Sequence, residues 1–295
     1  MVATARPRRS MLYMPASNAR ALDKARGLAA DALIFDLEDA VAPDMKPAAR
    51  DQLAAATRQG GYGGRELLVR VNGLATAWGD ADLRAAAVMP IDGVLLPKIE
   101  SAAAVRAAEV ILVEADAPAS LAIWCMMETP LGVLHAEAIA GASPRLGGLV
   151  MGTSDLAKDL HAAPTRDRLP LQTALGLCLL AARAYGVAIV DGVHLDLADD
   201  EGFAAACRQG RELGFDGKTL IHPKTIAMAN RVFAPSPDEV AWARRIIVAH
   251  GEAVAAGKGI VLVDGQLIEN LHVESARRLV ALADQVAALE AAATG

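Results

Sequence analysis

The chain has 295 residues, of which 54% are hydrophobic and only 3% aromatic, and its formal net charge is -6. Much of the apolar fraction is alanine, which favours helix, and no apolar run approaches the roughly 20 residues that a membrane-spanning helix needs. The composition therefore predicts an ordinary globular protein with one large core or two small ones, and the acidic balance argues against general nucleic-acid binding.

The N-terminal residues and the cysteines indicate a reducing compartment. Residues 1–9 carry arginines but lack the apolar core of a signal peptide, so we expect a cytosolic protein. The three cysteines, Cys125, Cys178 and Cys207, are odd in number and set in apolar surroundings. This pattern favours reduced core thiols over a disulfide framework or a zinc site.

Short apolar runs alternate along the chain with longer, alanine-rich segments of helical period. We expect eight strands: Met11–Met14, Ala32–Leu37, Leu67–Val71, Gly93–Leu96, Leu121–Met127, Gly148–Met151, Val187–Val190 and Lys218–Ile221. No hairpin-turn signal pairs neighbouring runs, so the pattern predicts parallel βα units that close into a (β/α)₈ TIM barrel. An open doubly wound sheet is the alternative. Such a sheet would be expected to carry a glycine-rich motif at the start of a helix, which we do not find.

A C-terminal segment follows the eighth strand, beyond a helical stretch and the break Ala234-Pro235-Ser236-Pro237. Its expected parts are a helix from Pro237 to about Gly257, an apolar run over Ile260–Val263, Asp264-Gly265, and a last helix to about Ala293. We therefore expect a TIM-barrel catalytic domain over 1–234 and a C-terminal helical extension over 235–295. Because the barrel does not need this extension, we expect it to pack on a neighbouring subunit or to cover a site.

Two carboxylates end successive apolar runs. Glu128 follows the fifth run and Asp155 follows the sixth, with one helix-sized segment between them. Because the C-terminal ends of parallel strands face one shared pocket, these side chains can give Mg²⁺ two hard oxygen ligands, with waters and a chelating substrate completing the octahedron. The alternative is that each carboxylate caps the helix that follows it. The two together favour a divalent-metal site.

Polar residues also end other strands, where barrel enzymes place their reactive groups. Arg70 ends the third run. An arginine there is costly unless it meets an anion, and its planar fork suits a carboxylate or the oxyanion of an enolate. The alternative is an ion pair with Glu38 or Asp39 at the end of the second run. Both can hold at once, because such a pair would also orient the arginine.

Three further features are less specific. Lys98 and Glu100, after the fourth run, favour a mutual or surface salt bridge. His222, which precedes a proline, fits a structural turn better than a catalytic base. Arg20 and Lys24 lie four residues apart on the first helix and form a basic face that can hold phosphates, with a solvated face as the alternative.

A series of short motifs extends in order over nearly the whole chain. They are Arg9–Ala16 with Asn18 and Arg20, Phe35–Val41, Val69–Asn72, Met127–Pro130, Gly152–Ala157, Gly214–Pro223, and Asp264-Gly265 with the helix after it. Together they resemble the citrate lyase beta-subunit-like branch of the HpcH/HpaI aldolase superfamily, which includes malyl-CoA and citramalyl-CoA lyases. One departure is His161, where relatives often have glycine.

The resemblance implies a TIM barrel with Mg²⁺ on Glu128 and Asp155, a CoA thioester or related thioester as substrate, and an assembly of trimers or hexamers. It also implies that Arg70 contacts the substrate and that Asp264, carried into a neighbour's active site, serves as acid/base. From the residues alone, Asp264-Gly265 is more typical of a turn. The remaining expected contacts are Glu38, Asp39, Gly152, Thr153 and Ser154 to the substrate, and Tyr13, Arg20 and Lys24 to CoA.

The predicted activity is a Mg²⁺-dependent carbon–carbon lyase or synthase acting on a 3-hydroxy-3-carboxyacyl-CoA such as malyl-, citramalyl- or citryl-CoA, giving an acyl-CoA and a 2-oxo acid. Mg²⁺ would polarise the hydroxy acid, while Arg70 and backbone amides near Gly152–Asp155 would stabilise the developing oxyanion. Two alternatives stay open. One is a malyl-CoA thioesterase or malate synthase-type enzyme, and the other is a citrate lyase beta subunit whose substrate rides on an acyl carrier protein.

Overall fold

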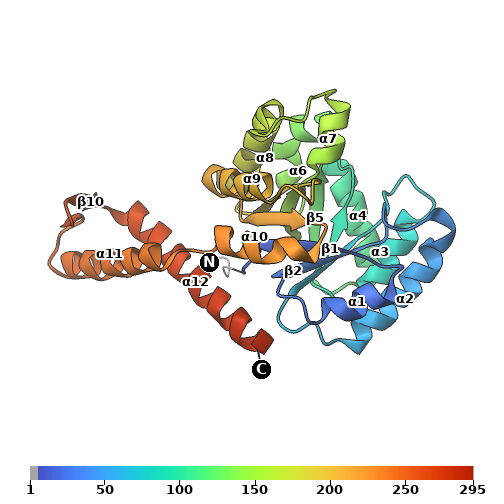
Figure 1. Cartoon of the computed structure of the whole chain (residues 1–295), viewed down its shortest axis with the longest axis horizontal. Coiled ribbons are helices and arrows are strands. Elements are labelled where there is room, and N and C mark those ends of the chain that lie inside the picture. The colour runs from blue at the N-terminus through green and yellow to red at the C-terminus, as the bar shows by residue number, and fades with distance from the viewer. Residues whose placement is uncertain (1–5, 295) are drawn as a thin grey trace. The chain divides into compact units, whose positions relative to one another are not determined.

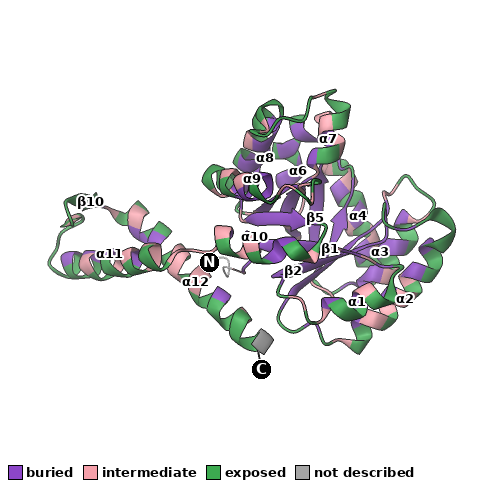
Figure 2. Cartoon of the chain, viewed as in Figure 1, coloured by how far each residue is buried: buried purple, intermediate pink, exposed green. Residues whose placement is uncertain are grey.

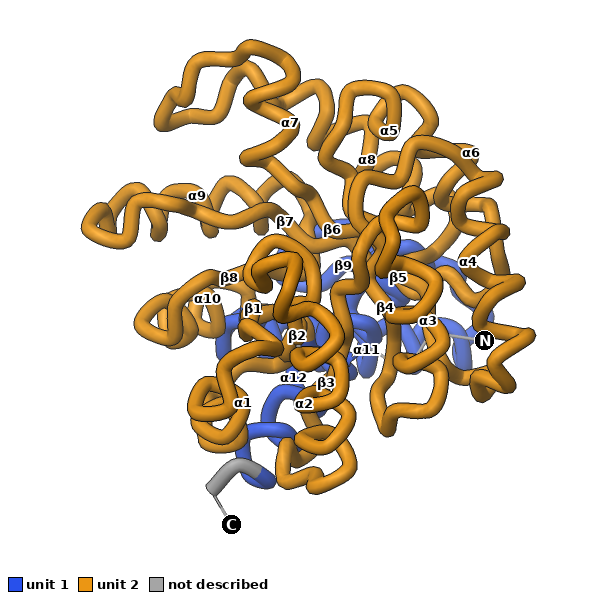
Figure 3. Tube along the Cα trace, turned by 90° about the vertical axis from the view of Figure 1, so that its right-hand side faces the viewer, with its two compact units in different colours: residues 1–7, 234–295 blue, residues 8–233 orange. Residues whose placement is uncertain are grey.

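The computed structural model describes residues 6–294, with side chains through residue 292. The described residues form two compact units, one over 8–233 and one over 6–7 with 234–294 (Figure 3). The first unit is the barrel and the second is the C-terminal extension. No helix within the described range is long and apolar enough to cross a membrane.

Eight parallel strands close into a barrel in chain order (Figure 1). They are β1 Ser10–Pro15, β2 Ala32–Asp36, β3 Glu66–Arg70, β4 Gly93–Leu96, β5 Ala122–Met127, β6 Leu146–Met151, β7 Ala188–Asp191 and β8 Gly217–Leu220. Each strand begins and ends within two residues of the apolar run that predicted it. The predicted TIM barrel is therefore confirmed, and the open sheet is wrong for this chain.

Helices cover the outside of the barrel, with their buried faces toward the strands and their other faces exposed (Figure 2). They are α1 Ala19–Ala25, α2 Lys46–Gln59, α3 Gly79–Ala87, α4 Ala102–Glu114, α5 Pro130–Leu134, α6 Ala136–Ala140, α7 Thr153–Asp159, α8 Gln172–Tyr185, α9 Asp200–Leu213 and α10 Ile226–Phe233. Short 3₁₀ turns lie at η1 Pro43–Met45, η2 Leu169–Leu171 and η3 Pro223–Thr225.

The hydrophobic core has two layers. A large layer lies between strands and helices, and a small one fills the barrel interior around Trp124, which is fully buried. Space for the indole comes from Gly148 on β6, because a Cβ there would lie 2.4 Å from the Trp124 ring. The three cysteines are buried and carry free thiols, as predicted.

A buried ion cluster joins β7, β8 and the loop before η2. Asp191 is fully buried. Its Oδ2 accepts a hydrogen bond from Lys218 Nζ at 2.7 Å, and both of its carboxylate oxygens accept from Arg168 Nη1 at 2.8 Å. Although burial opposes its charge, Lys218 and Arg168 hold the pKa of Asp191 below its ordinary value. One carboxylate therefore compensates two cations inside the barrel wall.

Replacing Asp191 by alanine should lower the free energy of unfolding by about 3–5 kcal/mol, because the buried Lys218 ammonium loses its partner. Denaturant unfolding followed by circular dichroism measures this loss. The exposed pair Arg84–Asp80 provides the control, and Asp80→Ala should cost less than about 1 kcal/mol. An equally small cost for Asp191→Ala would contradict the role given to the cluster.

The C-terminal extension has a small core of its own. Its elements are α11 Pro237–Ala255, β9 Val261–Val263, β10 Gln266–Ile268 and α12 Asn270–Thr294. The sequence indicated both helices and an apolar run where β9 lies, but not β10. Asp264 and Gly265 have φ angles of 49° and 79° and connect β9 to β10. Positive φ at both positions is typical of the tightest hairpin turns, so the turn interpretation of Asp264-Gly265 is confirmed.

Candidate active site

A cavity of about 420 Å³ is lined by residues at the C-terminal ends of the barrel strands. Among the predicted site residues, the structure brings these together around it: Tyr13, Asp39, Arg70, Glu128, Gly152, Thr153, Ser154 and Asp155. This is the end of a TIM barrel at which enzymes of this architecture carry their active sites.

Glu128 and Asp155 lie on adjacent strand ends, because β5 and β6 still pair through the bond from Gly152 N–H to Met127 C=O at 3.1 Å. Thr129 Oγ1, not Glu128, caps α5 by accepting from Gly132 N–H at 3.0 Å. The capping alternative is therefore wrong for Glu128. Asp155 lies in the first turn of α7, where its charge also favours the helix.

Gly152 leaves room for the Glu128 side chain. A Cβ at position 152 would lie 2.3 Å from Glu128 Cβ and 2.6 Å from Oε2. Any larger residue would push the carboxylate away from the place where it lines the cavity.

Burial raises the pKa of Glu128 to about 7, above its ordinary value, and the neighbouring Glu38 charge adds to this. The hydrogen bond from Lys98 N–H at 2.7 Å and the Lys98 and Arg70 charges oppose the rise. Glu128 is only 2% exposed, so an ionised carboxylate there lacks most of its hydration. A cation would offset that loss.

This raised pKa predicts how stability depends on pH in the metal-free protein. The folded state holds the Glu128 proton more tightly than the unfolded chain does, so this group's contribution to stability is lost as pH rises through about 7. With a chelator present, the free energy of unfolding of Glu128→Gln relative to that of wild type should rise by roughly 2–3 kcal/mol between pH 4.5 and pH 8, at about 1.4 kcal/mol per pKa unit. Urea unfolding of both proteins at the two pH values measures this difference. The same change of stability with pH in the variant and in wild type would contradict the prediction.

Arg70 is held by carboxylates of the β2 end. Its Nε and Nη2 donate to Asp36 Oδ1 and Oδ2 at 2.8 and 2.7 Å, and Nη1 lies 2.8 Å from Glu38 Oε2 and 3.5 Å from Asp39 Oδ2. The guanidinium also stacks over Tyr13, and Asp36 raises the pKa of Arg70 against the effect of burial. The predicted pairing with Glu38 and Asp39 is present, and Asp36 is the bidentate partner that the sequence interpretation missed.

Lys98 also has different partners from those expected. Its ammonium donates to Glu38 Oε1 at 3.0 Å and lies 4.0 Å from Asp155 Oδ2, so of the two expected alternatives, a mutual pair with Glu100 or a surface salt bridge, the mutual pair is wrong. Lys98 therefore belongs to the charged network of the site. The sequence signal available for it was its position two residues after a buried strand.

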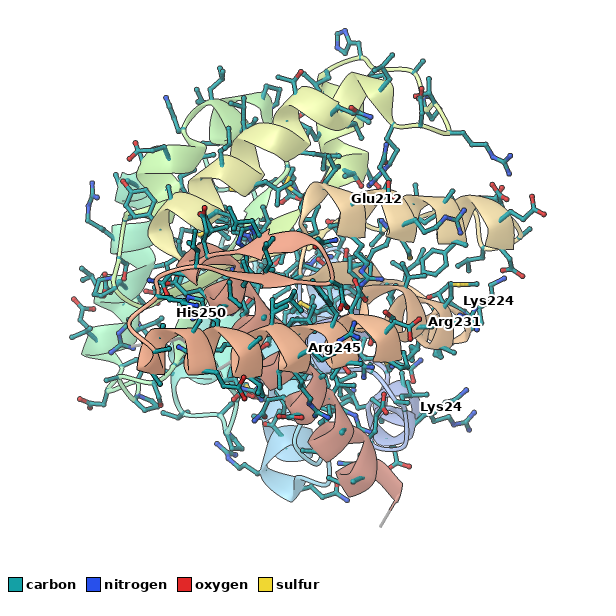
Figure 4. All side chains as sticks on the ribbon, turned by 90° about the vertical axis from the view of Figure 1, so that its left-hand side faces the viewer. Lys24, Glu212, Lys224, Arg231, Arg245 and His250 are labelled. Carbon is teal, nitrogen blue, oxygen red and sulfur yellow. The ribbon has the colours of Figure 1, made fainter. Side chains whose placement is uncertain are left out.

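Other predicted residues are not among those that line the cavity. Arg20 and Lys24 are exposed on α1, where Lys24 projects from the helix (Figure 4). His222 is exposed, and its Nδ1 accepts from Lys224 N–H at 3.1 Å, as in a structural turn. Asp264 lies in the extension, with its side chain 63% exposed and 3.4 Å from Nη2 of Arg245, which is labelled on α11 in Figure 4.

The donor set fits a hard divalent cation. No group of three or more His, Cys, Asp or Glu side chains among residues 6–292 could hold a metal. Glu128 and Asp155 both line the cavity and offer it two carboxylate donors. Mg²⁺ commonly takes one or two protein carboxylates and fills its other positions with water and substrate oxygens.

Known proteins share both sequence and fold with this chain. A (3S)-malyl-CoA thioesterase of Cereibacter sphaeroides is 52% identical over 99% of this chain and 100% of its own length. An L-malyl-CoA/beta-methylmalyl-CoA lyase of the same species is 34% identical, covering 96% of this chain and 97% of its own.

A crystal structure of the protein CitE from Mycobacterium tuberculosis, in complex with magnesium, acetoacetate and coenzyme A, superposes with a TM-score of 0.75. It is 32% identical and covers 96% of this chain and 100% of that one. The family model for HpcH/HpaI aldolase/citrate lyase matches residues 9–223. The chain therefore belongs to the HpcH/HpaI aldolase/citrate lyase family, as its motifs predicted.

Proposed function

We propose that this protein is a Mg²⁺-dependent enzyme acting on a malyl-CoA-type thioester, and that its main reaction is hydrolysis to malate and free CoA. The observation that carries the proposal is the shared cavity, which sets two carboxylates for a cation beside an anchored arginine. The choice of hydrolysis follows from 52% identity over the full length of a malyl-CoA thioesterase, against 34% for the lyase.

Glu128 and Asp155 would hold the cation, which supplies Lewis-acid polarisation of the hydroxy acid when bound. Arg70 stabilises negative charge on the substrate side of the cavity. Its fork is fixed by Asp36, so the guanidinium is already oriented before substrate binds, which is the condition for strong electrostatic stabilisation.

The small and hydroxyl-bearing residues of the β6 end would contact the substrate. Gly152, Thr153 and Ser154 all line the cavity, as does Asp39 across from them at the β2 end. Glu38 would act on the substrate indirectly, by its ion pairs with Arg70 and Lys98. Tyr13 lines the same cavity, whereas the exposed Arg20 and Lys24 would hold phosphates of CoA outside it.

In the hydrolytic reaction, water adds to the thioester carbonyl, the C–S bond breaks, and CoA leaves as the thiol after taking a proton. The base that activates the water would be Asp264 of a neighbouring subunit in a trimer or hexamer. Three free buried thiols support a reducing, cytosolic location for this assembly.

Carbon–carbon cleavage is the second candidate, because a cation site beside an oxyanion-stabilising arginine suits loss of an enolate as well as hydrolysis. Here the bond between the hydroxyl-bearing carbon and the thioester's α-carbon would break, giving acetyl-CoA and a 2-oxo acid. The 34% identical lyase supports this reading.

Product analysis separates these reactions. The purified protein is incubated with malyl-CoA and Mg²⁺, and free thiol, acetyl-CoA and 2-oxo acid are measured together. We expect thiol without acetyl-CoA or 2-oxo acid. Equimolar acetyl-CoA and 2-oxo acid would establish the lyase instead, and activity only on an acyl-carrier-protein thioester would identify a citrate lyase beta subunit. Parallel assays with methylmalyl-, citramalyl- and citryl-CoA define the acyl group.

A further inference from the structure

Lys98, which follows β4, contacts carboxylates from the ends of three other strands. Its backbone N–H donates to Glu128 Oε1 at 2.7 Å, and its ammonium donates to Glu38 Oε1 at 3.0 Å. The same ammonium lies 4.0 Å from Asp155 Oδ2. One residue thus joins both expected metal ligands to Glu38, one of the carboxylates that pair with Arg70.

The backbone of Lys98 is strained. Its φ angle is 49°, in the left-handed region where a Cβ crowds the chain and which glycine adopts freely. Most other non-glycine residues with positive φ in the described part are aspartate or histidine, the types that tolerate this region best. A lysine at such a position indicates that its side chain is used, because the backbone alone would favour glycine.

The electrostatic setting favours an exchange of cations. The Lys98 side chain is 51% exposed and the Asp155 side chain is 34% exposed, so the ammonium can move into water at little cost. A divalent cation bound to Asp155 would place two positive charges close to a third. Repulsion at this range in a partly shielded site is substantial.

We propose that Lys98 is the resident counter-ion of the metal site. Its ammonium neutralises Asp155 and Glu38 before the divalent cation binds and competes with that cation for Asp155. Its N–H keeps Glu128 Oε1 in place throughout. Lys98 is therefore a positioning residue that sets metal affinity, and the inference rests on the proposed placement of the cation at Glu128 and Asp155.

Titration calorimetry of the full chain with Mg²⁺, at pH 8.5 and without substrate, tests this role. Lys98→Met and Lys98→Gly should each bind Mg²⁺ about three- to tenfold more tightly than wild type, since a competing positive charge is gone. Lys98→Arg keeps the charge and should stay close to wild type. A residue needed only for structure would weaken binding when removed, so tighter binding is specific to the counter-ion role.

Asp116→Gly is the matched control for backbone strain. Asp116 has a φ angle of 56°, is exposed, and does not line the cavity, so this variant relieves the same kind of strain without touching the site. Its Mg²⁺ affinity should equal that of wild type. If it tightened as much as Lys98→Gly, strain relief would explain the change and the proposal would be wrong.

Glu128→Gln separates failure of this inference from failure of the proposed function. Mg²⁺ binding that Glu128→Gln leaves intact would overturn the metal placement itself, and the role of Lys98 with it. Binding that depends on Glu128 but is unchanged or weaker in Lys98→Met would overturn only the role of Lys98.

Discussion

Glu128→Gln is expected to lower Mg²⁺-dependent turnover by about a thousandfold or more while the barrel stays folded. The cation's stabilisation of developing charge is worth several kcal/mol, and each 1.36 kcal/mol is tenfold in rate. Glutamine keeps the volume of the side chain, so the close packing against Gly152 is preserved. Initial rates over a Mg²⁺ series, with circular dichroism of the same samples, measure both effects.

Asp155→Asn should behave in the same way, because in the proposed site the two carboxylates hold one cation. The matched control is Glu100→Gln, which neutralises an exposed glutamate two residues beyond Lys98 and should leave turnover unchanged. Full Mg²⁺-dependent activity in either ligand variant would remove the metal assignment. Loss of activity together with loss of the folded signal would indicate a structural role instead.

The barrel could be predicted because each strand has a local signal in the sequence. Runs such as Leu67–Val71 are short, apolar and separated by helical segments, and no hairpin signal competes with parallel pairing. The placement of Glu128 and Asp155 at one cavity followed from topology alone, since carboxyl ends of parallel strands share one face.

The Asp36–Arg70 pair shows where sequence reasoning stops. These residues are direct partners in the register of β2 and β3, and a shift by one residue would point them to different faces. Register depends on how all eight strands close, which no local pattern encodes. The left-handed backbone of Lys98 likewise accompanies a tertiary contact, since its N–H donates to Glu128 just after the next strand.

Asp264 shows the opposite case, in which the local signal was sound. Asp-Gly predicted a turn, and the structure has that turn between β9 and β10. A turn does not exclude chemistry, because the Asp264 side chain is 63% exposed and its ion pair within the described part of the chain is with the exposed Arg245. The residue lies at the tip of the β9–β10 hairpin, and we propose that it acts there in the site of a neighbouring subunit.

Asp264→Asn is expected to lower turnover by about 10²–10⁴-fold, the usual contribution of a positioned acid or base, with no loss of stability. Asn-Gly is as favourable as Asp-Gly in this type of turn, so the hairpin should persist. The lost ion pair to Arg245 is exposed on both sides and contributes little. Arg245→Gln is therefore the control: it breaks the same ion pair but should keep activity.

Subunit mixing shows whether Asp264 acts across an interface. Asp264→Asn and Arg70→Met chains, each inactive alone, are unfolded together at equal concentration and refolded. If a site takes Arg70 from one chain and Asp264 from its neighbour, about a quarter of the sites in random mixed oligomers receive both intact residues, so about a quarter of wild-type activity should return. If both residues must come from the same chain, no mixed site is complete and no activity returns. Restoration thus depends on geometry between subunits and not on the strength of either substitution.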